Sequence, residues 1–350
     1  MDREVSSLID ELSESHSLGL EGYRRLVELY SDRAASLLAE RAFAVRRQVY
    51  GTAVFIRGLI EISNICRNDC LYCGIRRSNA RLRRYRLDPD TIVACAREGH
   101  ALGFRTIVLQ GGEDPHFDDD VLCDIVARIV VACPDTAVTL SMGERSDESY
   151  RRLFEAGATR YLLRHETATK AHYELLHPSD MSFERRMRCL RVLRDVGFQV
   201  GAGMMVGAPF QTTADLAADL KFIEEFKPDM AGIGPFIPHH DTPFADMPAG
   251  TVELTCYLLS IVRLIHPSVL MPATTALASI DAHGRERGML AGANVVMPNL
   301  SPVSVRKDYA LYDNKAALGS ESAQARQALA RQMEAMGLEV VVARGDVARA

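Results

Sequence analysis

The sequence predicts an α/β protein built on a complete (β/α)8 barrel of the TIM type, preceded by a helical N-terminal lead-in. The chain has 350 residues, of which 47% are hydrophobic, so it can bury the core of one large α/β unit. From residue 51 onward, short β-rich runs alternate with amphipathic helical patterns, which is typical of parallel strands joined by helical crossovers. Eight such runs can be counted, the number of strands that closes a parallel barrel.

The elements follow in order along the chain. Apolar residues recur at helical spacing in the first fifty residues, at Leu26, Leu29 and Tyr30, then at Leu37, Leu38 and Phe43. Strands are expected at 60–64, 106–110, 137–141, 160–164, 199–206, 230–235, 269–274 and 294–297. Helices are expected at 88–102, 118–131, 146–156, 182–196, 212–226, 252–265 and 281–290. Several helices begin with Ser, Thr or Asp and several end near glycine, as at Gly103, Gly157 and Gly197, so both ends carry capping signals.

This pattern divides the chain into three expected parts. A helical N-terminal extension occupies residues 1–50, and the barrel occupies residues 51–315 without a linker that would split it. From about residue 320 the alternation is lost, so residues 316–350 are expected to form a C-terminal helix and tail that packs on the barrel or trails it.

Composition excludes several classes of protein. The 41 basic and 46 acidic side chains give a net charge of −5, so neither a nucleic acid nor another polyanion is expected as a partner. The N-terminus lacks the apolar segment of a secretory signal, and no run is long enough to cross a bilayer. We therefore expect a cytoplasmic protein whose cysteines stay reduced.

Three of the eight cysteines are clustered, and they are the strongest chemical signal in the chain. Cys66, Cys70 and Cys73 lie within eight residues, at spacings of four and three. Three thiolates can hold three irons of a 4Fe–4S cubane, which leaves one iron without a protein ligand. An enzyme can fill that position with a chelating small molecule, so the spacing indicates catalysis. The other five cysteines are scattered through apolar stretches and are expected to be buried small hydrophobic residues.

The alternative interpretations of the cysteines are a zinc knuckle or a redox pair, since a Cys-x2-Cys motif is compatible with either. Zinc would need a fourth ligand, and no histidine follows at finger spacing. The three cysteines also follow a predicted barrel strand instead of lying in a small zinc ribbon. The iron–sulfur interpretation is therefore preferred.

Other polar residues follow the predicted strands, where the active site of a parallel barrel lies. Gly111, Gly112 and Glu113 follow the second strand; alone, they would indicate only a tight turn. Arg164 and Glu166 end the fourth strand and are expected on one face because they are two residues apart; a structural salt bridge is the alternative. Arg186 could be a solvated arginine, or could grip a carboxylate with two hydrogen bonds.

Six arginines directly follow the cysteines: Arg76, Arg77, Arg81, Arg83, Arg84 and Arg86. Such a run is usually a solvated, ion-paired surface. Our hypothesis is that it receives an acidic flavodoxin or ferredoxin that delivers the electron.

The cysteine spacing, with Tyr72 before the last cysteine, resembles the signature of the radical S-adenosylmethionine (SAM) superfamily. The resemblance implies one 4Fe–4S cluster on Cys66, Cys70 and Cys73, whose open iron is chelated by SAM. Reductive cleavage of SAM would then give methionine and a 5'-deoxyadenosyl radical. Tyr72 would lie near the adenine, while Gly111, Gly112 and Glu113 match the motif that holds the methionine amino group.

Longer stretches resemble the HydE-type maturase of FeFe hydrogenase, at 66–76, 85–87, 109–115, 164–167, 232–239, 272–276 and 292–299. This resemblance spans roughly residues 50 to 315 and implies an enzyme in assembly of the diiron site of the H-cluster. Its substrate would be an iron complex with CO, cyanide and cysteine, supplied by a partner maturase. Glu166 would bind the ribose and Arg186 the methionine carboxylate. Arg164, Thr274, Thr275 and Tyr309 would line the anionic substrate pocket, and no catalytic side chain is assigned beyond the cluster ligands.

The chain departs from some members of this family in one respect. Those members carry a second iron–sulfur cluster near the C-terminus, whereas this chain has no cysteine after Cys256. We expect no accessory cluster. The rival interpretations are a sister radical enzyme, such as a methylornithine synthase or a biotin-synthase-like sulfur transferase, and a non-catalytic iron–sulfur scaffold.

Overall fold

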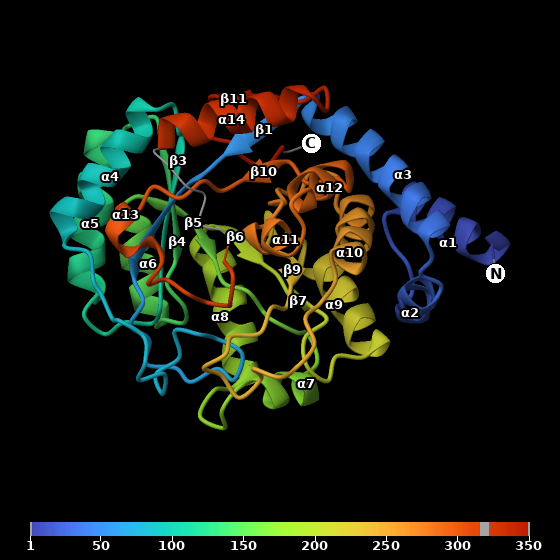
Figure 1. Ribbon diagram of the computed structural model, residues 1–350, viewed down its shortest axis with the longest axis horizontal. Helices are drawn as coiled ribbons and strands as arrows, with labels where there is room; N and C mark the ends of the chain where they lie inside the picture. Colours follow the sequence, from blue (N-terminus) through green and yellow to red (C-terminus); the bar gives the residue numbers. More distant parts are fainter. Residues whose placement is uncertain (1, 316–321, 349–350) are drawn as a thin grey trace.

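The N-terminal fifty residues form three helices that pack on one side of the molecule (Figure 1). The computed structural model describes residues 2–315 and 322–348. The first helices are α1 (Asp2–Ser15), α2 (Leu20–Glu28) and α3 (Asp32–Tyr50). Helix α3 packs against α10 (Val252–Ile265), and α2 packs against α9 (Thr213–Phe226). The helical spacing of apolar residues in this segment therefore predicts its secondary structure correctly.

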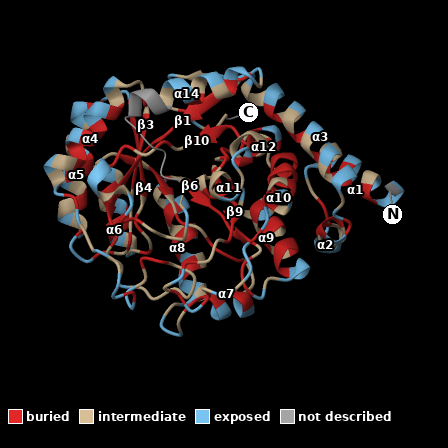
Figure 2. Ribbon diagram, in the orientation of Figure 1, coloured by how far each residue is buried: buried red, intermediate tan, exposed pale blue. Residues whose placement is uncertain are grey.

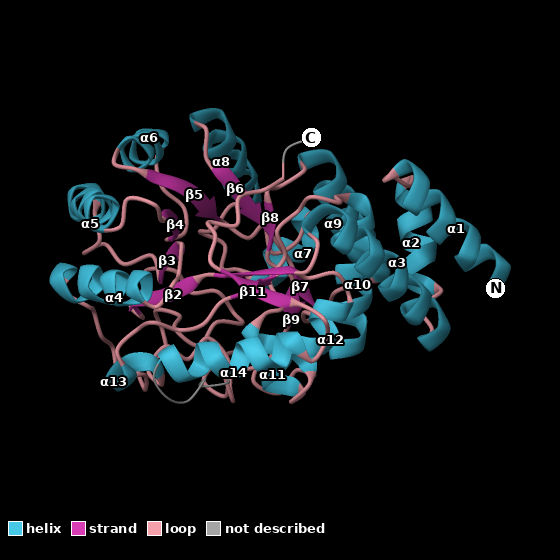
Figure 3. Cartoon of the chain, turned by 90° about the horizontal axis from the view of Figure 1, so that it is seen from above, coloured by secondary structure: helices cyan, strands magenta, loops and turns pink. Residues whose placement is uncertain are grey.

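A six-stranded parallel sheet follows, with its strands side by side in chain order. Its strands are β2 (Gly58–Ser63), β3 (Thr106–Gly111), β4 (Ala137–Ser141), β5 (Ala158–Leu162), β6 (Gln199–Ala202) and β8 (Met230–Ala231). The crossover helices lie outside the strands (Figure 3). They are α4 (Pro89–Ala101), α5 (Asp119–Ala132), α6 (Asp147–Glu155), α8 (Phe183–Val196) and α9. The short helix α7 (Lys170–Leu176) lies between β5 and α8 in the chain and is not among the outer helices in this view. The parallel α/β class predicted from the alternating pattern is confirmed.

The expected continuous eight-stranded barrel is not what the ladders of the described residues form. Strand β1 (Ala53–Ile56) pairs with β10 (Val295–Val296) and with β11 (Glu339–Val341), and β7 (Met205–Val206) pairs with β9 (Gly234–Pro235). The predicted strand at 269–274 makes only isolated bridges, at Leu270 and Pro272. The predicted strands at 199–206 and 230–235 are each interrupted. At the interruption the backbones approach closely, since a Cβ on Gly203 would lie 2.1 Å from the carbonyl oxygen of Gly232.

The helix boundaries follow the capping signals in the sequence. Side chains of Asp88, Asp118, Ser146, Ser182, Thr212 and Thr251 accept a hydrogen bond from a backbone amide in the first turn of the helix that each precedes. Helix α8 ends at Gly197, whose φ of 110° is readily adopted only by glycine. The predicted helix at 281–290 is shorter than expected and begins at Gly284. The remaining helices are α11 (Thr275–Ile280), α12 (Gly284–Leu290), α13 (Val303–Arg306) and α14 (Ser322–Glu334).

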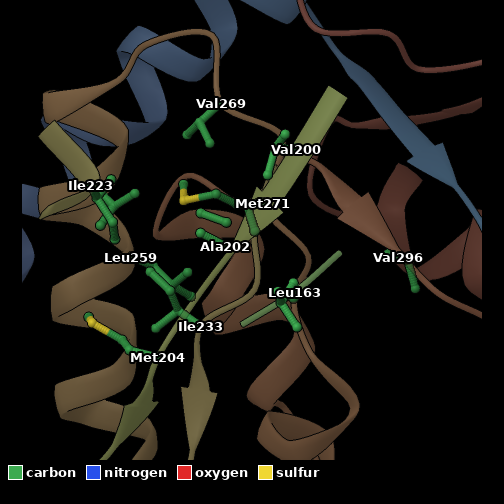
Figure 4. Close-up of a cluster of buried hydrophobic side chains, with 14 of the residues drawn as sticks. Leu163, Val200, Ala202, Met204, Ile223, Ile233, Leu259, Val269, Met271 and Val296 are labelled. Atoms are coloured by element: carbon green, nitrogen blue, oxygen red, sulfur yellow. The ribbon is translucent and has the colours of Figure 1, made fainter. Parts of the chain in front are cut away.

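The core fills the space among the strands and between the strands and helices. Buried residues follow the strands and the inner faces of the helices, while exposed residues follow the outer helix faces (Figure 2). Figure 4 shows part of this core, in which Val200 and Ala202 from β6 lie near Ile233 and Met271. Helix α10 contributes a nearly continuous row of buried side chains. In the described part of the chain, none of the helices is long and apolar enough to span a membrane.

The C-terminal segment returns to the parallel strands. Strand β11 lies parallel to β1, and the Arg160 guanidinium donates a 2.6 Å hydrogen bond to Asp346. Arg160 is fully buried in β5, so this ion pair joins the end of the chain to the centre of the sheet. Of the predicted C-terminal part, residues 316–321 and 349–350 lie outside the described residues.

Candidate active site

The three clustered cysteines lie in the long loop between β2 and α4. Arg84 organises this loop by donating hydrogen bonds to the backbone carbonyls of Asn64, Ile75, Arg76 and Asn79. Burial lowers the pKa of the Arg84 guanidinium, whose hydrogen bonds are all internal to the loop. Arg76 and Arg86 pair with Asp69 and Asp114. Within the predicted arginine surface, Arg84 is therefore a structural residue, whereas Arg77, Arg81 and Arg83 are exposed.

The glycine motif after β3 packs directly on the cysteine loop. A Cβ on Gly112 would lie 2.2 Å from the carbonyl oxygen of Ile65 and 2.7 Å from the Cβ of Cys66. The backbone N–H of Glu113 donates to Cys66 Sγ at 3.4 Å, and the N–H of Arg67 donates to the carbonyl oxygen of Glu113 at 3.0 Å. Only glycine fits at position 112 without a shift of the loop. The cysteine loop and the glycine motif, which are remote in sequence, are therefore in direct contact.

The thiols themselves are half-buried and free. Burial raises the pKa of the Cys66 thiol and raises that of Cys73 to about 12. Burial also raises the pKa of Cys70, and the Cys70 sulfur lies 3.7 Å from the Met181 thioether. Thiolates at these positions require a compensating positive charge, which bound iron supplies.

The geometry does not favour a single zinc ion at the cysteines. Among residues 2–315 and 322–348, His239, His240 and Asp313 form a group whose ligand atoms lie within 4.8 Å of one another, and the three thiols do not form such a group. Hydrogen bonding accounts for the histidine group, because Nδ1 and Nε2 of His240 face the carboxylates of Asp313 and Asp241 at 2.6 and 3.2 Å. This group is therefore a surface charge network.

Tyr72, which precedes the third cysteine, points toward the end of α7. Its hydroxyl lies 3.1 Å from Nε2 of His177, and the two rings meet edge to face at 5.4 Å. Burial, together with the positive charge of the nearby Arg186, lowers the pKa of His177 to about 3. The histidine is therefore neutral at physiological pH.

Glu144 joins two of the predicted site residues. Its carboxylate accepts a 2.7 Å hydrogen bond from Nε of Arg186, and its backbone N–H donates to Oε1 of Glu113 at 2.9 Å. Arg186 is buried at the start of α8 and also donates to the carbonyl oxygen of Arg164 at 2.7 Å. Arg185 and Arg67 also bind Glu144 and Glu113, respectively. Arg186 is thus held inside the site. The alternative interpretation, a solvated arginine, is wrong because the side chain is buried.

Arg164 and Glu166 lie beyond the strand that was expected to contain Arg164, because β5 ends at Leu162. They still approach to 3.3 Å, but loop geometry brings them together: Glu166 has a φ of 67°, uncommon for a residue other than glycine. Nη2 of Arg164 and Oε2 of Glu166 are the two atoms of this ion pair, which lacks hydrogen-bond geometry, and in the described structure Nε of Arg164 is buried without a hydrogen-bond partner. Nε of Arg164 can therefore donate a hydrogen bond to a polar ligand.

Tyr309 and Thr275 line a cavity of about 250 Å³, together with residues of β2 and of the segments at 239–240 and 306–315. The Tyr309 hydroxyl accepts a 3.3 Å hydrogen bond from Gln110, and burial raises the pKa of this tyrosine. The same cavity contains the fully buried Glu61, which binds Lys315 and Asn299. Thr274 directly precedes α11 without capping it through its side chain, and its buried hydroxyl has no hydrogen-bond partner in the described chain.

Comparison with known proteins identifies the family. A sequence profile of the Radical SAM superfamily matches residues 60–223. The [FeFe] hydrogenase maturase subunit HydE of Thermotoga maritima is 49% identical over 278 residues, which cover 79% of each chain. The chain belongs to the HydE family of radical SAM enzymes.

More distant relatives of this HydE-family member share its fold. The 3-methylornithine synthase of Methanosarcina acetivorans is 27% identical over 335 residues, covering 94% of this chain and 92% of that protein. A crystal structure of methylornithine synthase superposes with a TM-score of 0.84 at 25% identity, covering 95% of this chain and 97% of the other. A crystal structure of HydG superposes with a TM-score of 0.80 at 18% identity, covering 97% and 76%, which shows a shared fold.

Membership of the radical SAM superfamily implies a 4Fe–4S cluster and SAM as cofactors. The residues present fit these groups. The donors are three thiols on one loop, and the glycine motif lies against that loop so closely that a Cβ would displace it. In this HydE-family chain, the Arg164–Glu166 ion pair follows β5 of the same sheet, and Nε of Arg164 is buried there without a hydrogen-bond partner in the described residues.

Several residues of the site were missed by sequence reasoning. Glu144 follows the third predicted strand, so the rule that polar residues collect after barrel strands could have found it. Glu61 lies inside a strand, and Lys315 lies in the C-terminal segment, where no such rule applies. His177 carries no sequence signal, because its contact with Tyr72 joins segments more than one hundred residues apart.

Proposed function

We propose that this protein is a maturase of FeFe hydrogenase that acts in assembly of the diiron site of the H-cluster. The observation that carries the proposal is the 49% identity to the HydE maturase subunit of Thermotoga maritima. Methylornithine synthase and biotin synthase are 27% identical in comparable alignments. The sister-enzyme alternative is therefore less well supported, and a non-catalytic scaffold would not need the SAM-binding motif beside the cysteines.

In this proposal Cys66, Cys70 and Cys73 hold one 4Fe–4S cluster. When bound and reduced, the cluster supplies the electron that cleaves SAM into methionine and a 5'-deoxyadenosyl radical. The chain's own residues orient SAM. Glu113 and the backbone of Gly111 and Gly112 receive the methionine amino group, and Arg186 receives its carboxylate. Tyr72 lies at the adenine and Glu166 at the ribose. Glu113 and Arg186 are both hydrogen-bonded to Glu144, and these contacts support the assignment.

The proposed substrate is an iron complex with CO, cyanide and cysteine, bound deeper among the strands by Arg164, Thr274, Thr275 and Tyr309. Nε of Arg164 and the hydroxyl of Thr274 are buried without a hydrogen-bond partner in the described residues, and they support binding of an anion because buried donors are stabilised by an acceptor. Another maturase would supply this substrate.

We infer that the strands close into a (β/α)8 barrel around this pocket. Isolated bridges support closure, since Leu270 joins β8, Pro272 joins β10, and Asn299 joins β2 at Leu59. The proposed division is a helical extension at 1–50, a barrel at 51–315 and a C-terminal part at 316–350. Pairing of β11 with β1 supports packing of the C-terminal part on the barrel.

The proposed electron donor is an acidic flavodoxin or ferredoxin in the cytoplasm. Exposed arginines at Arg77, Arg81 and Arg83 lie on or near the cysteine loop, so a docked carrier would lie close to the cluster. Neutralising these three residues should slow reduction by flavodoxin at low salt and leave reduction by dithionite unchanged. Unchanged reduction by flavodoxin would contradict this docking site.

The proposal predicts one cluster and no accessory cluster, because no cysteine follows Cys256. Anaerobic reconstitution should load about four irons per chain, and Cys66→Ser should abolish the cluster. About six to eight irons in well-defined clusters would contradict a single site.

The function is tested by incubating reconstituted, reduced protein with SAM and measuring 5'-deoxyadenosine. We expect this product, and we expect no methylornithine when lysine is present. Formation of methylornithine would overturn the maturase assignment in favour of the sister enzyme. Loading of the cluster without any 5'-deoxyadenosine would favour the scaffold, and one zinc ion per chain without iron would exclude both.

A further inference from the structure

His177 connects the end of α7 to the aromatic residue of the cysteine loop. It is the first residue after α7 and is 3% exposed. Its ring stacks on Tyr173 with a centroid distance of 3.9 Å and meets Tyr72 edge to face on another side. The imidazole is therefore held by packing as well as by its hydrogen bonds.

The two ring nitrogens of His177 have different partners, which fixes the direction of each hydrogen bond. Nδ1 lies 2.9 Å from the carbonyl oxygen of Tyr173. A carbonyl oxygen can only accept, so Nδ1 carries the proton. In a neutral imidazole Nε2 is then an acceptor, and the Tyr72 hydroxyl must donate to it across 3.1 Å.

The bond is distinct from the backbone contact that joins the same two segments. The N–H of Leu71 donates to the carbonyl oxygen of Leu176 at 3.0 Å, which already ties the loop to α7. The contact between His177 and Tyr72 adds a restraint on the side chain of Tyr72. Its effect is on the orientation of the ring and not on the course of the loop.

We propose that His177 is a positioning residue of the SAM site, which holds the Tyr72 ring in the orientation that receives the adenine. This inference rests on the proposed function, since Tyr72 is assigned to the adenine there. Tyr173 extends the arrangement toward the other end of SAM, because the Arg186 guanidinium lies 5.8 Å from the centre of the Tyr173 ring. Packing of Tyr72, His177, Tyr173 and Arg186 thus links the residue proposed for the adenine to the one proposed for the methionine carboxylate.

The test is a double-mutant cycle in the reconstituted protein with its cluster. His177→Phe removes the acceptor, Tyr72→Phe removes the donor, and the double variant removes both. We expect each single variant to bind SAM about 5-fold more weakly in anaerobic equilibrium dialysis, as loss of one neutral hydrogen bond predicts. The double variant should be no weaker than either single variant, because both remove the same contact.

Two further measurements separate positioning from a structural role. The KM for SAM should rise while kcat for 5'-deoxyadenosine stays within about 2-fold, and His177→Gln, which retains an acceptor, should restore part of the affinity. His172 on the same helix is the matched control: it is buried and its Nε2 bonds to the carbonyl oxygen of Pro209. His172→Phe should lower thermal stability without changing SAM affinity.

SAM affinity equal to that of the unmodified protein in both His177→Phe and Tyr72→Phe would overturn the inference, as would effects that add in the double variant. Should His177→Phe fail to fold, Tyr72→Phe still tests the contact because it removes the donor, and unchanged SAM affinity in that variant would overturn the inference. Failure of the unmodified protein to bind SAM would instead overturn the proposed function itself, and this inference with it.

Discussion

Gly112 follows β3 and Cys66 follows β2, yet a Cβ on the glycine would lie 2.7 Å from the Cβ of the cysteine. Real Cβ atoms do not approach so closely, and the carbonyl oxygen of Ile65 is nearer still at 2.2 Å. The first cysteine proposed to bind the cluster and the glycine motif proposed to bind SAM are thus in direct contact, without space between them.

Substitution of Gly112 by Ala should therefore displace the cysteine loop and reduce cluster loading. We expect Gly112→Ala to bind less than half the iron of the unmodified protein after anaerobic reconstitution, with a normal far-UV circular dichroism spectrum. Gly19 is the matched control, because a Cβ there would meet nothing within 4 Å. Gly19→Ala should load iron normally; equal loading of Gly112→Ala would show that the loop yields without loss of its ligands.

Glu144 should affect SAM binding although it is not assigned to touch SAM. Its loss leaves the buried Arg186 guanidinium without its carboxylate partner, so the guanidinium is less well oriented. Glu144→Ala should raise the KM for SAM about 10-fold, as expected for one charge-assisted hydrogen bond, and Glu144→Gln should raise it less. Glu148→Ala, which removes an exposed partner of Arg151, serves as the control. An unchanged KM in Glu144→Ala would refute the role of Glu144.

The ion pair between Arg160 and Asp346 should stabilise the attachment of the C-terminal segment. Asp346→Asn leaves a fully buried guanidinium without its carboxylate, a change that costs 3 to 5 kcal/mol in the interior. Asp346 is half exposed, so we expect about 1 to 2 kcal/mol. The thermal midpoint should fall by about 2 to 4 °C. Asp135→Asn, which alters an exposed ion pair, should change it much less.

The network of His240 should make stability depend on pH. A hydrogen bond that the His240 ring donates to Asp313 raises the pKa of His240 above its ordinary value of 6.5; Asp241 raises the pKa further and Arg81 opposes this. A raised pKa in the folded state stabilises the fold below pH 6.5, and this contribution is lost as pH rises through the folded-state pKa. His239 also faces this network, and burial lowers its pKa.

The difference in thermal midpoint between the unmodified protein and His240→Gln should therefore be larger at pH 6 than at pH 8.5. Asp313→Asn should lose stability at pH 6 in the same direction. A difference that grows with rising pH would contradict the assignment of His240 as a protonated bridge.

Much of the architecture could be predicted because its signals are local. The caps at Asp88, Ser182 and Thr212 mark helix starts in the sequence, and the structure places helices directly after them. Strand β11 could not be predicted, since three residues near the C-terminus carry no period. The strand expected at 269–274 has the expected apolar pattern, and its apolar residues are buried. Its backbone nevertheless makes only isolated bridges, so it does not form a regular strand.

The site shows the same division between local and long-range information. The spacing of the three cysteines predicts that they lie on one loop. Polar and glycine residues collect at the carboxyl ends of parallel strands, and this rule predicts that Gly112 lies beside them. Glu144 could have been found by that rule. Glu61 and His177 could not, because their roles depend on contacts with Lys315 and Tyr72, which are remote in sequence.

The measurement that tests the central claim most directly is activation of an apo FeFe hydrogenase by its maturases, with this protein supplied in place of the HydE component. The assignment predicts hydrogen production that requires SAM and this protein, and that is lost in Cys66→Ser. Normal loading of the cluster and turnover of SAM, without any activation of the hydrogenase, would contradict the assignment.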